Sequence, residues 1–229
     1  MIPWVLLDEA RVAVDGKRLS LYQRDSEFSI RLGGSAELMN SRSHGSEEAL
    51  AELACSRLVG RDRPHVLIGG LGMGFTLAAA LRQLDADARL TVSELVPEVV
   101  TWNRGPLGEL AGHPLLDPRV TVREGDVARI IKAQPRAYDA ILLDVDNGPE
   151  GLTHNDNDWL YGSDGLSAAY AALRAGGVLA VWSASRVQVF TGRLLKAGFE
   201  VEEVRVRARR TRGARHVIWL AQSLAAKTD

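Results

Sequence analysis

From residue 64 onward, short apolar runs alternate with segments of helical periodicity. Runs such as VLIGG, AILLD and VLAVW are apolar on both faces, which is typical of parallel strands buried between two layers of helices. The alternation predicts an α/β fold with a mostly parallel sheet. We expect its strands at His65–Gly69, Arg89–Glu94, Val120–Glu124, Ala140–Asp144 and Val178–Ser183. The expected helices are Phe75–Leu84, Pro97–Arg104, Val127–Ala133, Ser163–Arg174 and Val187–Ala197, before a terminal antiparallel hairpin of Glu200–Arg209 and His216–Gln222.

The first 45 residues show a different sequence pattern, which predicts short strands separated by turns. Asp15-Gly16 and Gly33-Gly34 supply the positive φ that tight hairpin turns require. We therefore predict a small antiparallel β-meander over residues 1–45 and a second, larger domain over residues 46–229. The meander strands are expected at Val5–Leu7, Arg11–Val14, Leu19–Gln23, Phe28–Leu32 and Glu37–Asn40. A helix is expected over Glu47–Leu58, with Ser46 as its N-cap.

Composition narrows the class of protein without naming an activity. The 229 residues include one cysteine, Cys55, so neither a disulfide framework nor a multi-cysteine zinc site is expected. No apolar run is long enough to span a membrane, and the N-terminus does not resemble a secretory signal, so we expect a cytoplasmic protein. A formal net charge of −1 argues against a general nucleic-acid binder. The arginines of the terminal hairpin are interpreted as a solvated edge that resists aggregation.

A glycine-rich turn follows the first strand of the larger domain. Gly70, Gly72 and Gly74 would let the backbone approach a ligand closely at the start of a helix. Glu94 ends the next strand, at the distance where doubly wound folds place an acid on a ribose hydroxyl, and Asp126 follows the third strand. The G-x-G-x-G spacing and the Gly-Asp pair favour an S-adenosylmethionine site over a dinucleotide site. Solvated strand ends are the alternative, and Asp126 could simply cap the following helix.

The segment after the fourth strand places two carboxylates and an amide, those of Asp144, Asp146 and Asn147, beside the expected ligand crevice. Carboxylates there would attract a small cationic or polar substrate, and one with a raised pKa could take a proton from an ammonium group. We regard Asp144 and Asp146 as candidate catalytic residues and Asn147 and Tyr161 as candidate substrate contacts. Ordinary turn chemistry is the alternative for the Asp and Asn residues. No metal is expected, because the next strand ends without an acid.

Together these motifs resemble the spermidine synthase (polyamine aminopropyltransferase) family, over roughly residues 18–183. They are the meander, the glycine loop, the acid ending the second strand, the Gly-Asp pair and the stretch Y-D-x-I-L-x-D-x-x-x-x-P. The resemblance implies the Rossmann-like fold of class I S-adenosylmethionine-dependent methyltransferases. It also implies that Glu94 binds the ribose, that Asp126 binds the adenine and that Asp144 deprotonates the attacking amine. Asn40 and Glu47 fall in the stretch that frames the substrate pocket in that family, and we expect a homodimer.

The glycine loop departs from the family pattern. Family members carry G-G-G-D-G to hold the aminopropyl amine, whereas Gly69–Gly74 contains no acid. We therefore expect an S-adenosylmethionine-type transferase that moves a methyl, or else an aminopropyl, group to a small amine or polar metabolite. The alternatives are a true aminopropyltransferase that uses decarboxylated S-adenosylmethionine, an RNA-directed methyltransferase and a non-catalytic nucleoside-binding protein.

Overall fold

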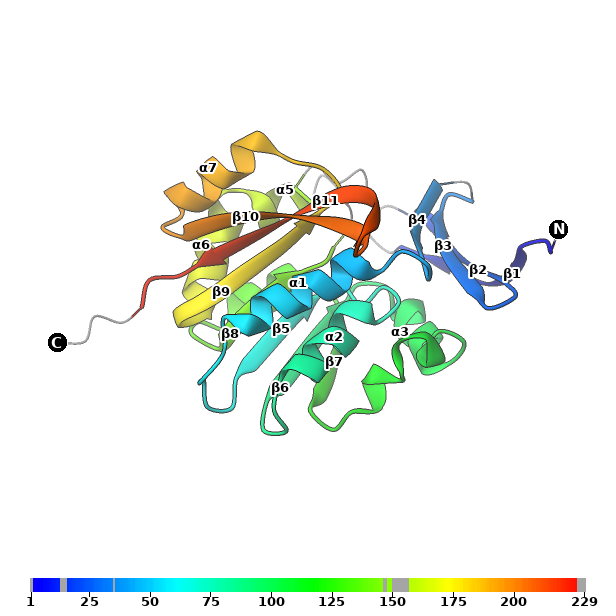
Figure 1. Cartoon of the computed structure of the whole chain (residues 1–229), viewed down its shortest axis with the longest axis horizontal. Helices are drawn as coiled ribbons and strands as arrows, with labels where there is room; N and C mark the ends of the chain where they lie inside the picture. The colour runs from blue at the N-terminus through cyan, green and yellow to red at the C-terminus, as the bar shows by residue number, and fades with distance from the viewer. Residues whose placement is uncertain (1, 13–15, 35, 146–147, 150–156, 226–229) are drawn as a thin grey trace.

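The computed structural model describes residues 2–12, 16–34, 36–145, 148–149 and 157–225. Within them the chain forms a four-stranded antiparallel sheet and a seven-stranded, mostly parallel sheet (Figure 1). No helix in these ranges is long and apolar enough to cross a membrane. The two sheets confirm the predicted fold class.

The small sheet has the strand order β1-β2-β3-β4. Its strands are β1 (Val5–Arg11), β2 (Arg18–Arg24), β3 (Glu27–Leu32) and β4 (Ala36–Asn40). The predicted break between Val5–Leu7 and Arg11–Val14 was wrong, because β1 continues from Val5 to Arg11 through the polar residues after Leu7; positions 13 and 14 lie outside the described residues. A bulge between Leu6 and Asp8 interrupts the register of β1 with β2. As an edge strand in which only Ala10 is buried, β1 tolerates these polar side chains.

The large sheet has the order β10-β11-β9-β8-β5-β6-β7, and β5, β6, β7, β8 and β9 run parallel. The parallel strands are β5 (His65–Gly69), β6 (Arg89–Glu94), β7 (Val120–Glu124), β8 (Tyr138–Leu143) and β9 (Leu173–Ser183). The predicted terminal hairpin is formed by β10 (Glu200–Arg209) and β11 (Arg212–Gln222), with β10 at the sheet edge. The strand order reverses between β5 and β8, the point at which open α/β sheets bind their ligands.

Helices cover both faces of this sheet, as its apolar strands predict (Figure 1). Val66 and Ile68 of β5 belong to one hydrophobic cluster and Leu67 to another, because successive strand residues point to opposite faces. The first face carries α1 (Gly45–Ser56), α2 (Phe75–Gln83) and α3 (Pro97–Arg104). The other carries α4 (Val127–Ala133), α5 (Asn157–Tyr161), α6 (Ser163–Ala172) and α7 (Gln188–Lys196). Two 3₁₀ turns, Gly108–Ala111 and Pro114–Leu116, lead into β7.

The meander packs against the first face. Leu21 and Ile30 of the small sheet share a hydrophobic cluster with Leu50 of α1 and Leu71 of the glycine loop. The indole of Trp102 also donates to Asp8 Oδ2 at 2.7 Å, which ties α3 to β1. These contacts bring the meander side chains to the ligand-binding edge of the large sheet.

Candidate active site

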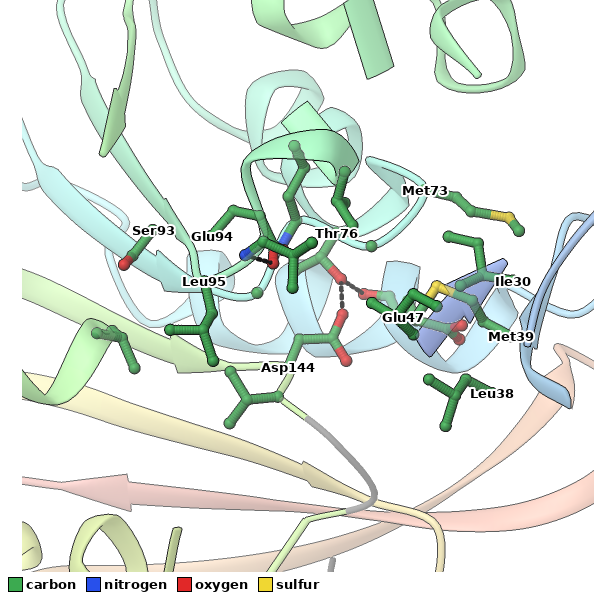
Figure 2. A pocket seen from close by; sticks show the side chains of 18 of the residues that line it. Ile30, Leu38, Met39, Glu47, Met73, Thr76, Ser93, Glu94, Leu95 and Asp144 are labelled. Atoms are coloured by element: carbon green, nitrogen blue, oxygen red, sulfur yellow. Dashed lines mark hydrogen bonds between the residues drawn. The ribbon is translucent and has the colours of Figure 1, made fainter. Parts of the chain in front are cut away.

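A cavity of about 210 Å³ lies where the carboxyl ends of β5, β6 and β8 meet the meander (Figure 2). Its lining combines the glycine loop, the ends of these strands, the starts of α1 and α2 and one side of the meander. Seven of the predicted site residues line it: Asn40, Glu47, Gly70, Gly72, Glu94, Asp126 and Asp144. The structure therefore gathers most of the predicted cofactor and substrate residues around one space.

The glycine loop needs glycine for two separate reasons. Gly70, Gly72 and Gly74 have φ values of +88°, +52° and +82°, in the left-handed region that other residues rarely adopt. In addition, a Cβ at Gly70 would overlap the backbone oxygen of Asp144. Gly74 is the N-cap of α2 and lies just outside the cavity lining. The loop is thus held close to the end of β8, with its backbone open to the cavity.

Glu94 ties the glycine loop to the loop after β6. Its two carboxylate oxygens accept backbone N–H bonds from Leu71 and Val96, each at 2.9 Å. Burial raises the pKa of the Glu94 carboxyl, and the backbone N–H bonds act in the opposite direction. Glu94 therefore organises the loop as well as lining the cavity.

Asp126 has the structural role that was considered as its alternative. Its Oδ1 accepts the backbone N–H of Ala128 at 2.8 Å and caps α4. The side chain also lines the cavity at the end of β7. Capping and ligand contact are compatible, because a carboxylate has a second oxygen that can accept hydrogen bonds.

Two acids from distant parts of the chain line the same part of the cavity (Figure 2). Asp144 directly follows β8, and its Oδ2 accepts a hydrogen bond from the hydroxyl of Thr76, in the first turn of α2, at 2.5 Å. Glu47 comes from the first turn of α1. We call Glu47 and Asp144 the acidic pair.

Both members of the acidic pair hold protons more tightly than ordinary carboxyl groups. Burial raises the pKa of Asp144 to about 6, against the opposing effect of the Thr76 hydrogen bond. Burial first, and then the nearby charge of Asp144, raise the pKa of Glu47 to about 7. The pair therefore changes charge near neutral pH, the range in which a general base is most effective.

The carboxylate of Glu47 is held by a short series of hydrogen bonds through Ser46 to His216. The hydroxyl of Ser46, which is fully buried, donates to Glu47 Oε2 at 2.6 Å. His216 Nδ1 of β11 lies 2.9 Å from the same hydroxyl oxygen. Ser46 was predicted to be the N-cap of the helix, and that prediction was wrong: α1 begins at Gly45, two residues before the predicted start at Glu47, and His44 is its N-cap. The hydroxyl orients an acid of the cavity instead.

The other residues predicted to contact the substrate differ in their position relative to the cavity. Asn40 lines the cavity, but its amide group donates to Glu37 Oε1 at 2.6 Å and accepts the backbone N–H of Arg42 at 3.1 Å. Tyr161 does not reach the cavity. It lies 1% exposed in the hydrophobic cluster on the other face, edge-on to Phe190. Its prediction as a substrate contact is not supported by this position, whereas Asp146 and Asn147 lie outside the described residues.

Sequence reasoning missed Thr76 and the meander side chains of the cavity. Thr76 stands 68 residues before Asp144, so its hydrogen bond has no local signal in the sequence. The meander contributes Val12, Leu19, Ile30, Leu32, Leu38 and Met39. Their apolar character was visible in the strands, but it is equally consistent with an ordinary core.

Ion pairs join the terminal hairpin to α1 and to its C-terminal cap. Arg210 bonds Glu48 at 3.1 Å and Glu52 at 2.9 Å, both on α1. Arg57 and Glu202 form a further ion pair between α1 and β10. These pairings attach the hairpin to α1, and the interpretation of its arginines as a solvated edge that resists aggregation stays a prediction. Among the described residues, no group of three or more His, Cys, Asp or Glu side chains could hold a metal ion.

Comparisons with known proteins extend the picture. No protein-family model matches the chain. Over 115 residues, or 50% of its length, the chain is 37% identical to putrescine N-methyltransferase 2 of Nicotiana attenuata and to putrescine N-methyltransferase 4 of Nicotiana tabacum. It spans 29% and 28% of the lengths of these relatives.

Solved structures match nearly the whole chain. A spermidine synthase in complex with the transition-state analogue AdoDATO superimposes with a TM-score of 0.78 at 18% identity, over 95% of this chain and 73% of that one. The spermidine synthase of Thermotoga maritima gives 0.72 at 17% identity, over 95% and 72% of the two chains. The chain has the spermidine synthase fold.

The resemblance drawn from the sequence motifs is thereby confirmed by two kinds of comparison. The spermidine synthase fold is observed with its meander as well as its large sheet, because the match covers 95% of the chain. A putative O-methyltransferase of Klebsiella pneumoniae matches 78% of the chain with a TM-score of 0.54. This likeness agrees with the predicted class I methyltransferase fold.

Proposed function

We propose that this chain transfers a methyl or aminopropyl group from an S-adenosyl sulfonium donor to a small amine, with Asp144 as the base. The observation that carries the proposal is the acidic pair, which lies where the glycine loop meets the meander. A donor on the glycine loop and an amine beside the pair would share one cavity. The names of the sequence relatives, putrescine N-methyltransferases, and of the structural neighbours, spermidine synthases, support this chemistry.

The residues around the glycine loop fit a nucleoside sulfonium. Gly70 and Gly72 leave the backbone accessible, and the carboxylates of Glu94 and Asp126 suit ribose and adenine groups that donate hydrogen bonds. Leu95 and Val96 also line the cavity and add apolar surface against which the adenine ring of the donor can pack. When bound, the donor supplies an electrophilic carbon beside a positively charged sulfur. The charged side chains that line the described part of the cavity are all acids, which favours cationic ligands.

Asp144 would act on the amine before transfer. An ammonium group has no lone pair for attack, so one of its protons must first leave. The raised pKa of Asp144 makes the carboxylate basic enough to accept that proton near neutral pH, while the Thr76 hydrogen bond holds one oxygen in place. Glu47 would hold the cationic amine next to Asp144. Orientation of the two reactants then supplies a further part of the rate enhancement.

The loop composition favours the methyl donor. Gly72 occupies the middle of a loop that carries no charged side chain. The space beside it is already filled by Met39, because a Cβ at Gly72 would lie 3.2 Å from the Met39 sulfur. An aminopropyl amine would find no carboxylate on this loop, whereas the uncharged loop does not repel the carboxylate of S-adenosylmethionine.

Calorimetric titration of the full chain with each donor tests this assignment. We expect S-adenosylmethionine to bind at least as tightly as decarboxylated S-adenosylmethionine. Tighter binding of the decarboxylated form would indicate a true aminopropyltransferase, and no binding of either would overturn the proposal. The homodimer, the cytoplasmic location and the division into domains 1–45 and 46–229 stay predictions.

A further inference from the structure

The hydrogen bonds behind Glu47 lead from the cavity to β11. Glu47 lines the cavity and accepts the hydroxyl of Ser46 at 2.6 Å, and Nδ1 of His216 lies 2.9 Å from the same hydroxyl oxygen. Ser46 is fully buried in the first turn of α1, whereas His216 lies 170 residues further along the chain, in β11. One member of the acidic pair is thus connected to a histidine that is outside the described lining of the cavity.

The direction of these bonds depends on His216, because a serine hydroxyl has a single hydrogen to donate. When Nδ1 carries a hydrogen, the ring donates to the Ser46 oxygen, and the Ser46 hydrogen is left for the Glu47 carboxylate. When Nδ1 carries none, it competes with Glu47 for that hydrogen. Burial lowers the pKa of His216, so the ring is neutral at mildly alkaline pH and carries one hydrogen, on either Nδ1 or Nε2. The position of this hydrogen then decides whether Glu47 keeps its donor.

The ring of His216 is held on the face of the sheet that carries α1. The indole of Trp182, which lines the cavity, meets the ring edge-on with the two centroids 4.8 Å apart. Val206 is the register partner of His216 on β10 and packs against the same hydrophobic cluster as Trp182. Arg205 and Arg207 flank Val206 and therefore point to the opposite face.

The other charged groups near this end of α1 have partners among themselves. Glu48 pairs with His44 at 3.5 Å and with Arg210 at 3.1 Å, and Glu52 pairs with Arg210 at 2.9 Å. The neighbouring stretch of β9, Val178–Ser183, carries no charged side chain. Glu47 is therefore the titratable group to which the hydrogen bonds connect the His216 ring.

We infer that His216 is a positioning residue, whose Nδ1–H turns the Ser46 hydroxyl towards the carboxylate of Glu47. Glu47 is thereby kept as an anion that can hold the cationic amine beside Asp144. This inference rests on the proposed function and adds two residues to it. The role concerns the binding of the amine and not its deprotonation, so it predicts a larger effect on KM than on kcat.

Kinetics test whether these hydrogen bonds serve amine binding. Loss of a hydrogen bond to a carboxylate raises its pKa by about one to two units. In Ser46→Ala the ionised fraction of Glu47, whose pKa is about 7, should therefore fall at about pH 8 from about nine-tenths to between about a half and about a tenth. We expect the KM for putrescine to rise by about two- to tenfold, with little change in kcat.

Substitutions at His216 show whether it acts through Ser46. His216→Phe keeps a ring against Trp182 and removes the Nδ1 donor, so the KM for putrescine should rise by less than in Ser46→Ala. His216→Asn can again present an N–H to Ser46 and should restore most of the affinity. Adding His216→Phe to Ser46→Ala should cause no further rise, and a full additional rise would contradict action through Ser46.

The tautomer of His216 tests the inference without any need for activity. In ¹⁵N NMR spectra of the full wild-type chain at about pH 8, we expect neutral His216 to carry its hydrogen on Nδ1. Ser46→Ala removes the acceptor of this hydrogen and should shift the ring towards the Nε2–H tautomer. His65, whose Nε2 lies 3.0 Å from Thr91 Oγ1, is the internal control and should keep its spectrum.

The outcomes separate the inference from the proposed function. An Nε2–H tautomer of His216 in the wild-type chain would overturn the inference and leave the transferase proposal standing. Failure of the wild-type chain to bind putrescine or any other amine in calorimetry would overturn the proposed function, and the positioning role would fall with it whatever the tautomer.

Discussion

The hydroxyl of Thr76 donates a hydrogen bond that lowers the pKa of the proposed base, Asp144, against the larger effect of burial. The Thr76 oxygen lies 2.5 Å from Asp144 Oδ2, and the Thr76 side chain is 3% exposed. Replacing Thr76 by valine keeps the shape of the side chain and removes the donor. The ionised form of Asp144 then loses a stabilising contact that the protonated form needs less. The pKa of Asp144, already raised to about 6 by burial, should therefore rise further.

The size of the effect follows from the strength of such bonds. A hydrogen bond to a charged group contributes about 1.5–3 kcal/mol. One pKa unit corresponds to about 1.4 kcal/mol, so Thr76→Val should raise the pKa of Asp144 by roughly one to two units. Activity requires the ionised carboxylate, so the acidic limb of the pH profile should move to higher pH by a similar amount.

The assay is kcat/KM against pH, with the amine that the chain uses best, for wild type, Thr76→Val and Thr76→Ser. Serine retains the hydroxyl and should keep the wild-type limb, which separates the hydrogen bond from a packing defect. At high pH the valine variant should approach the wild-type rate. A Thr76→Val limb at the wild-type position, in a protein that folds normally, would refute the role given to this hydrogen bond.

Three further changes test other parts of the account. Gly70→Ala should abolish donor binding and cost more than about 2 kcal/mol of stability in urea unfolding, because the new Cβ would overlap the carbonyl of Asp144. The control is Gly112→Ala, which is also at positive φ but has open space around it. It should cost only about 1 kcal/mol in the same measurement. Glu94→Gln replaces one of the two accepting oxygens by an NH₂ group, which cannot accept the backbone N–H of Leu71 or Val96. We therefore expect weaker donor binding in calorimetry and a loss of about 2 kcal/mol in stability. Wild-type values of both would contradict the organising role of Glu94. The pKa of Glu47 is raised from 4.5 to about 7 in the folded chain, so the free energy of unfolding should fall as the pH rises across this range. In Glu47→Gln this fall should be smaller by about 2–3 kcal/mol between about pH 5 and about pH 8. Parallel stability curves for the two proteins would refute the assignment.

The parallel core could be read closely from the sequence because its signals are local. The observed β5, β6, β7, α3 and α4 have the predicted bounds, since apolar runs and helix-start residues define both ends. The meander was less predictable, because β1 is an edge strand whose exposed side chains do not alternate cleanly. Ser46 shows the same limit: its sequence position suits a helix cap, but its tertiary partners Glu47 and His216 decide its role.

The donor side of the site was more predictable than the acceptor side. Gly70, Glu94 and Asp126 follow strand ends in a fixed topology, so their positions follow from the fold. The acidic pair joins residues 97 positions apart, and only the packing of α1 against β8 reveals it. Tyr161 was expected at the site because it follows a polar loop, yet helix α5 turns it into the core beside Phe190.

Substitution of Asp144 by asparagine tests the central claim most directly. The variant keeps the size of the side chain and its position after β8 and removes the base, so S-adenosylmethionine should bind with nearly the wild-type Kd in calorimetry. Transfer to the amine should fall by about 10²–10⁴-fold, the usual contribution of a general base. Full turnover in Asp144→Asn would contradict the account.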